Sequence, residues 1–136
     1  MNQILILMQG HPGSGKSTLA IVLAIEHGAI ICSTDDFHHD TDGVYRFQPD
    51  KLGEFHKRNQ ERVAELLKQG KSVIVDNTNI FAWQCQPYVE TARLLNIPIK
   101  VMRATGNFQT IHGVPAERIE QMKRDMEDLE AAFGLK

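Results

Sequence analysis

The chain has few of the residues that secreted and membrane-spanning proteins need. Its 136 residues include two cysteines, Cys32 and Cys85, which show neither metal-ligand spacing nor a disulfide framework. We therefore expect two reduced, buried thiols, as is usual in the cytoplasm. No apolar run reaches the ~18 residues of a membrane span, and no charged-then-apolar signal peptide opens the sequence. The prediction is a cytoplasmic protein that does not enter a membrane.

Positive charge is also scarce. The 15 Lys and Arg residues are outnumbered by 17 Asp and Glu, which gives a formal net charge of −2. A protein that coats nucleic acid makes many Lys and Arg contacts to phosphate, so this balance excludes that class. A single nucleotide or one strand end, held by a local basic site, stays compatible with it. The length leaves no room for a second core, and we expect one domain over 1–136.

Apolar runs and amphipathic stretches alternate along the chain. We expect strands at 3–9, 29–32, 72–75 and 97–102, and helices at 16–27, 51–69, 82–95 (or from Pro87) and 115–133. The first helix is expected to have Leu19, Val22 and Leu23 on its apolar face, and the apolar residues of the last helix keep a three-four spacing. This βαβα order predicts an α/β fold with a mostly parallel sheet and helices on both faces. Ligands of such sheets bind beyond the carboxyl ends of the strands. The residues that follow each strand are therefore the first candidates for a site, and we expect them to converge on one crevice.

The first strand leads directly into a phosphate-binding loop. The sequence GHPGSGKST fits G-x-x-x-x-G-K-[ST] and stands between an apolar strand and a helix. Glycines let backbone N–H groups turn toward phosphate oxygens, and the helix offers its positive end to the same anion. Lys16 is expected to reach the β- and γ-phosphates, and Ser17 to place its hydroxyl on Mg²⁺. The candidate contacts for ATP are Gly10, His11, Pro12, Gly13, Ser14, Gly15, Lys16, Ser17 and Thr18.

Polar residues follow the second and third strands. Asp76 comes directly after a β-branched apolar run, where a carboxylate can hold Mg²⁺ directly or through water. Asp35 is placed to take the proton of an acceptor hydroxyl, although a cap or turn role is the alternative. Asp36 is expected to cap or support the segment that carries Asp35, next to the substrate. Asn79 is expected to contact the substrate.

Phosphoryl transfer also needs a cation that stabilises charge on the transferred group. Arg103, at the end of the fourth strand, is our candidate, with Arg118 and Arg124 on the last helix as alternatives. Residues 107–114 are predicted to form a lid. His112 in that lid either touches the nucleotide or makes a structural contact.

The irregular stretch 33–50 is long enough to be functional or disordered. In it Tyr45 and Arg46, followed by Phe47, either stack on a base and pair with a phosphate or anchor the core of the loop. The same stretch contains four possible metal ligands, but their spacing matches no closed zinc pattern. We therefore expect a polar substrate loop and not a metal site at His38, His39, Asp40 and Asp42.

The helix at 51–69 carries polar residues on its apolar face. His56 and Asn59 lie three apart, and they either make core hydrogen bonds or contact a ligand. A solvated face is expected for Lys57, Arg58 and Arg62.

These motifs together resemble the polynucleotide-kinase-like P-loop family. GHPGSGKST, STDDF at 33–37, YRF at 45–47, VDNTN at 75–79 and HGVP at 112–115 follow the order of that family over nearly the whole chain. The resemblance implies a three-layer αβα P-loop fold. It also implies ATP, Mg²⁺ and transfer of the γ-phosphate to a hydroxyl, on a nucleic-acid 5′ end or a small acceptor.

The resemblance also assigns roles. Asp35 matches the general base of the family, Lys16 the phosphate ligand and Asp76 the acid at the strand end. The family places an arginine in the lid shortly before HGVP, where this chain has Gln109, Thr110 and Ile111. Arg103 is the expected substitute, and Arg46 is the next candidate for a contact to a substrate phosphate.

Three functions are compatible with this sequence. The first is a polynucleotide 5′-hydroxyl kinase. The second is a nucleoside, nucleotide or small-metabolite kinase, favoured by the small size and the pI of about 6.3. The third is an ATP-binding or ATPase module completed by an arginine of a partner, favoured by the lid that lacks its arginine.

Overall fold

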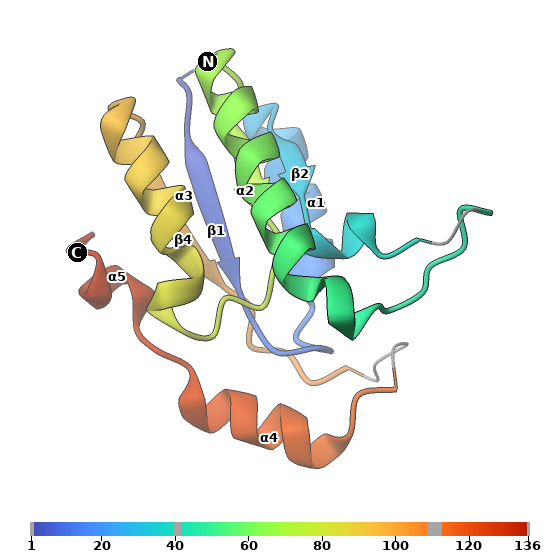
Figure 1. Ribbon diagram of the computed structural model, residues 1–136. Helices are drawn as coiled ribbons and strands as arrows, with labels where there is room; N and C mark the ends of the chain where they lie inside the picture. The colour runs from blue at the N-terminus through green and yellow to red at the C-terminus, as the bar shows by residue number, and fades with distance from the viewer. Residues whose placement is uncertain (1, 40–41, 109–112, 136) are drawn as a thin grey trace.

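The computed structural model describes residues 2–39, 42–108 and 113–135, which form a parallel sheet with helices on both faces (Figure 1). The four strands are β1 (Leu5–Gln9), β2 (Ile30–Cys32), β3 (Val73–Val75) and β4 (Ile99–Arg103), in the order β2-β3-β1-β4. The helices are α1 (Lys16–His27), α2 (Leu52–Lys68), α3 (Ala82–Leu94), α4 (Ala116–Asp125) and α5 (Leu129–Ala132), with short 3₁₀ turns η1 (Thr34–Phe37) and η2 (Pro49–Lys51).

The central strand β1 separates two hydrophobic cores because its side chains alternate between the faces of the sheet. Leu5 and Leu7 pack in the core that α2 and α3 cover, whereas Ile6 and Met8 pack against α1. All five residues of β1 are buried, as expected for a central parallel strand. The structure confirms the predicted three-layer αβα fold.

Helix α1 has the bounds that the sequence predicts, because a glycine stands at each end. Gly15 precedes the helix with a φ of 86°, and Gly28 ends it with a φ of 62°, which favours a residue without a side chain. Leu23 is buried, as predicted, but Val22 is 56% exposed and does not face the sheet. The prediction that Val22 belongs to the buried face was wrong.

The predicted last helix at 115–133 is two helices. The backbone is extended at Met126, which ends α4. Helix α5 begins after Asp128, whose side chain accepts from the Ala131 N–H and so caps the helix. Tertiary contacts stabilise the break, since the Glu127 N–H donates to the Ile80 carbonyl at 2.9 Å. The backbone carbonyl of Glu127 accepts from the Gln9 amide at 2.8 Å. The apolar three-four spacing gave no sign of these contacts.

Two of the compositional expectations can be compared with the described residues. Cys32 and Cys85 are free and buried, as predicted. Within residues 2–39, 42–108 and 113–135, no helix has both the length and the apolar character needed to cross a membrane.

Candidate active site

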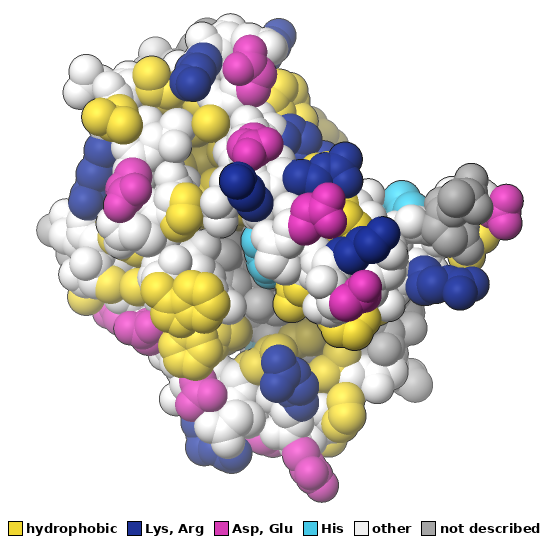
Figure 2. Space-filling view, in the orientation of Figure 1, with side chains coloured by type: hydrophobic (Ala, Val, Ile, Leu, Met, Phe, Trp, Pro, Cys, Tyr) yellow, Lys and Arg dark blue, Asp and Glu magenta, His cyan; other side chains and the backbone are white. Residues whose placement is uncertain are grey.

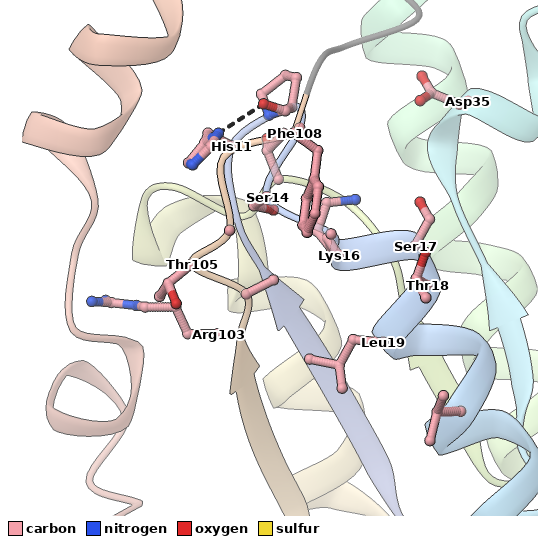
Figure 3. A pocket seen from close by; sticks show the side chains of 17 residues that line it. His11, Ser14, Lys16, Ser17, Thr18, Leu19, Asp35, Arg103, Thr105 and Phe108 are labelled. Atoms are coloured by element: carbon pink, nitrogen blue, oxygen red, sulfur yellow. Dashed lines mark hydrogen bonds between the residues drawn. The ribbon is translucent and has the colours of Figure 1, made fainter.

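A cavity of about 940 Å³ lies at the carboxyl edge of the sheet (Figure 3). Its lining comes from the phosphate loop and the first turns of α1, from Asp35 after β2, from Thr78 after β3, and from residues 103–106 and 108 at and beyond the end of β4. Backbone hydrogen bonds hold these segments together: the Gly10 N–H donates to the Thr78 carbonyl at 3.1 Å. The Gly106 N–H likewise donates to the Ser14 carbonyl at 2.9 Å. The predicted convergence of the strand ends is confirmed.

The phosphate loop is compact because its first glycine makes a close approach. A Cβ atom on Gly10 would lie 2.4 Å from Ser14 Oγ and 3.2 Å from the Ala104 carbonyl oxygen. Gly13 and Gly15 have φ values of 82° and 86°, which let the chain curl into a concave turn before α1. Such a turn, next to a helix N-terminus, is a shape that binds phosphate.

Lys16 and Ser17 both contact the acid that follows β3. Lys16 Nζ donates to Asp76 Oδ1 at 2.6 Å, and Ser17 Oγ donates to Asp76 Oδ2 at 3.3 Å. A hydroxyl and a carboxylate side by side supply the hard oxygen ligands that Mg²⁺ prefers. The donor set of Ser17 and Asp76 therefore fits the predicted magnesium site.

The turn η1 carries Asp35 to the edge of the cavity. Its cap is Ser33, whose hydroxyl accepts from the Asp35 N–H at 3.2 Å and whose N–H donates to the Asp36 carboxylate at 3.2 Å. The Thr34 N–H donates to Asn77 Oδ1 at 2.9 Å, which ties η1 to the strand end that carries Asp76. Asp35 therefore lines the cavity, whereas the Asp36 carboxylate accepts the second hydrogen bond of the cap.

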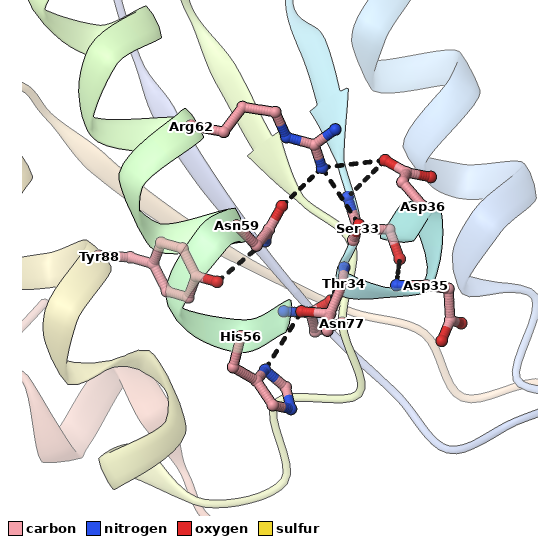
Figure 4. Close-up of polar contacts among 9 residues, drawn as sticks. All are labelled: Ser33, Thr34, Asp35, Asp36, His56, Asn59, Arg62, Asn77 and Tyr88. Atoms are coloured by element: carbon pink, nitrogen blue, oxygen red, sulfur yellow. Dashed lines mark hydrogen bonds and ion pairs between the residues drawn. The ribbon is translucent and has the colours of Figure 1, made fainter. Parts of the chain in front are cut away.

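Arg62 braces η1 from helix α2 (Figure 4). Its guanidinium donates to the Ser33 carbonyl at 3.1 Å, to Asp36 at 2.9 Å and to Asn59 Oδ1 at 2.6 Å. Asn59 in turn donates to the Tyr88 hydroxyl at 2.9 Å inside the core. The prediction of a solvated face was therefore wrong for Arg62, while Asn59 makes a core hydrogen bond, one of the two alternatives. The three-residue spacing of these two side chains was the available signal.

His56 is a second link between α2 and η1. Its Nδ1 lies 3.2 Å from the Thr34 hydroxyl. Burial and the neighbouring His38 lower the pKa of His56, and the Asp35 carboxylate opposes this shift. The ring contacts the segment that bears the candidate base, and its position fits a structural contact.

Arg103 points away from Lys16 (Figure 3). Its Nε donates to the Gln9 side chain at 2.9 Å and its Nη2 to the Glu127 carbonyl at 3.0 Å. Asn79, expected at the substrate, is only 2% exposed and donates to the Met8 carbonyl at 2.7 Å. Both side chains are thus engaged within the fold, and their roles at a substrate stay predictions.

The loop between η1 and η2 places aromatic rings around a buried histidine, and of these rings Tyr45 and Phe47 are 42% and 54% exposed. His38 is fully buried, accepts from the Gln48 N–H at 3.0 Å, and lies 5.0 Å from the Phe47 ring and 6.3 Å from the Tyr45 ring. These contacts fit the loop-anchor alternative for Tyr45 and Phe47. Burial and the nearby Asp35 raise the pKa of Tyr45.

Some predictions fall outside the described residues, namely those on Asp40, on the lid positions 109–111 and on His112. In the part of the chain that the structure describes, no group of three or more His, Cys, Asp or Glu side chains is arranged to hold a metal ion.

Comparison with known proteins places the chain in a family. A model described as an AAA domain matches residues 5–128. Human NEDD4-binding protein 2 is 36% identical over 131 residues, which are 88% of this chain and 7% of that protein. The chain therefore spans a small fraction of this relative.

Solved structures share the fold. A chain of the Pnkp1/Rnl/Hen1 RNA repair complex has a TM-score of 0.73 at 24% identity, over 96% of this chain and 46% of that chain. The Mycobacterium tuberculosis APS kinase CysC in complex with AMPPNP and APS has a TM-score of 0.57 at 20% identity, over 96% and 72% of the two chains. The predicted P-loop fold and the predicted family resemblance are confirmed.

Proposed function

The chain belongs to the AAA domain family, and from this premise we propose that it transfers the γ-phosphate of ATP to a hydroxyl acceptor. The acceptor we favour is the 5′-hydroxyl of a nucleic acid. The observation that supports transfer is the arrangement of three strand ends. Lys16 and Ser17 lie within hydrogen-bond distance of Asp76, and Asp35 lines the same cavity from the next strand.

In this proposal the phosphate loop binds the triphosphate, with Lys16 on the β- and γ-phosphates. Ser17 and Asp76 would hold Mg²⁺, which when bound neutralises charge between these phosphates. Asp35 accepts the proton of the acceptor hydroxyl while the new bond to phosphorus forms and the bond to the β-phosphate oxygen breaks. The cap of η1 orients the Asp35 backbone for this task.

The position of Arg103 favours a second candidate function, an ATPase module that is completed by an arginine of a partner. Among the residues lining the cavity, the Lys and Arg side chains are Lys16 and Arg103, and Arg103 is bonded to Gln9 and Glu127. Arg103 must leave both partners to reach a transferred phosphoryl group. An ATPase module completed by an arginine from a partner would need no such movement.

Two observations bear on the acceptor. The likeness to a chain of an RNA repair complex favours a nucleic-acid end. The face that contains α2 favours a short acceptor, because Lys and Arg side chains are interspersed there with Asp and Glu (Figure 2). A long strand would need a continuous basic track. We propose contact with the terminal nucleotides alone, with Arg46 as the loop candidate for a contact to their phosphate.

A labelling experiment tests these functions. The protein is incubated with γ-labelled ATP and Mg²⁺, and with 5′-hydroxyl DNA, 5′-hydroxyl RNA or nucleosides. Label on an oligonucleotide end supports the 5′-kinase, and label confined to nucleosides supports the small-acceptor kinase. ATP consumption without a labelled acceptor supports the module. Absence of both nucleotide binding and ATP consumption contradicts the proposal.

A further inference from the structure

Phe108 is an exposed aromatic residue beside the phosphate loop that none of the roles above uses. Its side chain is 68% exposed, yet it lies in the lining of the cavity with Lys16 and Ser17. The sequence placed it only within the predicted lid at 107–114 and gave it no individual role. A solvent-exposed phenylalanine at the mouth of a ligand cavity is a candidate contact for an apolar part of the ligand.

The position of Phe108 is determined by the phosphate loop itself. Its backbone N–H donates to the Gly13 carbonyl at 2.7 Å, next to the bond between Gly106 and Ser14. Its ring rests on two glycines: a Cβ atom on Gly15 would lie 3.1 Å from the ring, and one on Gly106 would lie 2.5 Å from it. The ring therefore stands on the loop at the place where these residues have no side chain.

Aliphatic side chains of α1 line the same cavity. Leu19 and Val22 lie along the helix that starts at the phosphate loop, and Val22 is 56% exposed. Figure 3 shows the Phe108 ring next to Lys16, with Thr18 and Leu19 following along α1. This explains why Val22 faces out of the core, since it forms part of a cavity wall.

A nucleotide has more to bind than its phosphates. The concave turn and the start of α1 account for the triphosphate, but a cavity of about 940 Å³ is large enough for the ribose and base as well. The face of a base is flat and apolar, and it stacks favourably on an aromatic ring.

We infer that Phe108 stacks on the base of the bound nucleotide, with Leu19 and Val22 completing an apolar wall. The inference rests on the proposed function, because it takes ATP as the ligand of the phosphate loop. It adds a residue that recognises the donor through the face of its base. Inorganic tripolyphosphate, which has no base, gains nothing from this contact.

Equilibrium titrations of the full chain with ATP, GTP and tripolyphosphate test this inference. Phe108→Ala is expected to weaken ATP and GTP binding about tenfold or more, as loss of one base–aromatic stack does. Tripolyphosphate binding stays at the wild-type value. Phe108→Trp restores nucleotide affinity, and its indole fluorescence changes on adding ATP. Trp83→Ala, which removes another exposed aromatic residue, is the matched control and changes none of the three affinities.

The outcomes separate this inference from the proposed function. If the wild-type protein binds ATP and Phe108→Ala binds it equally well, the stacking role is wrong and the nucleotide site stands. If Phe108→Ala loses tripolyphosphate as strongly as ATP, the ring supports the loop and does not stack on the base. If the wild-type protein binds none of the three probes, both the nucleotide site and the stacking role are overturned.

Discussion

Lys16 Nζ lies 2.6 Å from Asp76 Oδ1, and this ion pair joins the start of α1 to the end of β3. Both side chains are mostly buried, with exposed fractions of 13% and 10%. In the proposed reaction the two groups have different ligands, since Lys16 binds phosphate and Asp76 supports Mg²⁺. The pair therefore satisfies both charges within the protein, and in the proposed reaction the nucleotide would exchange it for contacts to the ligand.

Removal of the Lys16 ammonium should weaken nucleotide binding. For Lys16→Ala we expect ATP affinity to fall about ten- to hundredfold, the range for loss of a charged hydrogen bond. Equilibrium titration with ATP measures the change. Lys57→Ala, which removes an exposed lysine of α2, is the control and should bind ATP like the wild type. Equal affinity in Lys16→Ala would contradict the assignment of the phosphate loop.

Asp35 should matter for transfer and not for ATP binding. We expect Asp35→Asn to lower the rate of phosphoryl transfer by about 10²- to 10⁴-fold, because an amide cannot accept the proton of the hydroxyl. Its ATP affinity should change by less than about twofold, because only transition-state contacts are lost. Asp50→Asn, at an exposed position of η2, is the control. Transfer at a normal rate by Asp35→Asn would show that another group is the base.

Arg62 is expected to act as a positioning residue through η1. Arg62→Gln loses the bonds to Ser33 and Asp36, so Asp35 is less well oriented and kcat should fall about tenfold or more. The KM for ATP should not change, because Arg62 is absent from the cavity lining. The matched control is Arg58→Gln. Arg58 and Arg62 are comparable because the guanidinium carbon of each lies 4.7 Å from the centroid of the Phe37 ring. An equal loss of kcat in both variants would indicate a general effect of charge.

The two thiols should be unreactive in the folded protein. Burial, aided by Glu127, raises the pKa of Cys85 to about 12, and burial also raises the pKa of Cys32. The thiolate is the reactive form, so little of it exists at pH 8. We expect Ellman's reagent to detect no thiol in the native protein and both thiols after unfolding in guanidinium. Rapid native reaction of either cysteine would contradict the buried positions.

His56 should make the protein less stable in mild acid. The pKa of His56 is lowered from its usual value near 6.5, so below that pH the unfolded chain binds a proton that the folded chain does not. Stability is therefore lost as the pH falls from 6.5 toward the lowered pKa. Urea midpoints at several pH values measure this. His56→Gln should show a shallower loss than the wild type, and an unchanged slope would rule out this role.

Local patterns were sufficient wherever a short segment carries its own signals. The phosphate loop and α1 follow from the glycines and the apolar run that precedes them, because turn geometry and helix ends depend on near neighbours. The parallel sheet follows in the same way from alternating strands and helices. Asp76 could be found because it comes directly after an apolar strand.

Such local patterns do not predict the direction in which a side chain points. The sequence predicts Arg62 to be a surface residue of α2. Its guanidinium nevertheless donates to the Ser33 carbonyl, because the fold brings the end of β2 beside that helix. Arg103 stands at the predicted strand end, but Gln9 and Glu127 draw its guanidinium away from Lys16. Such partners are distant in sequence, so neither spacing nor composition reveals them.

By itself the sequence determined the P-loop fold, the phosphate loop and the strand ends that form the cavity. Those features can be predicted because short motifs and the alternation of apolar strands with amphipathic helices are visible in the local sequence. Only the tertiary structure decided the break at 126–128, the brace by Arg62 and the place of Phe108 on the loop glycines. Each of these depends on contacts between segments far apart in the chain, which come together only when the sheet and its helices have packed.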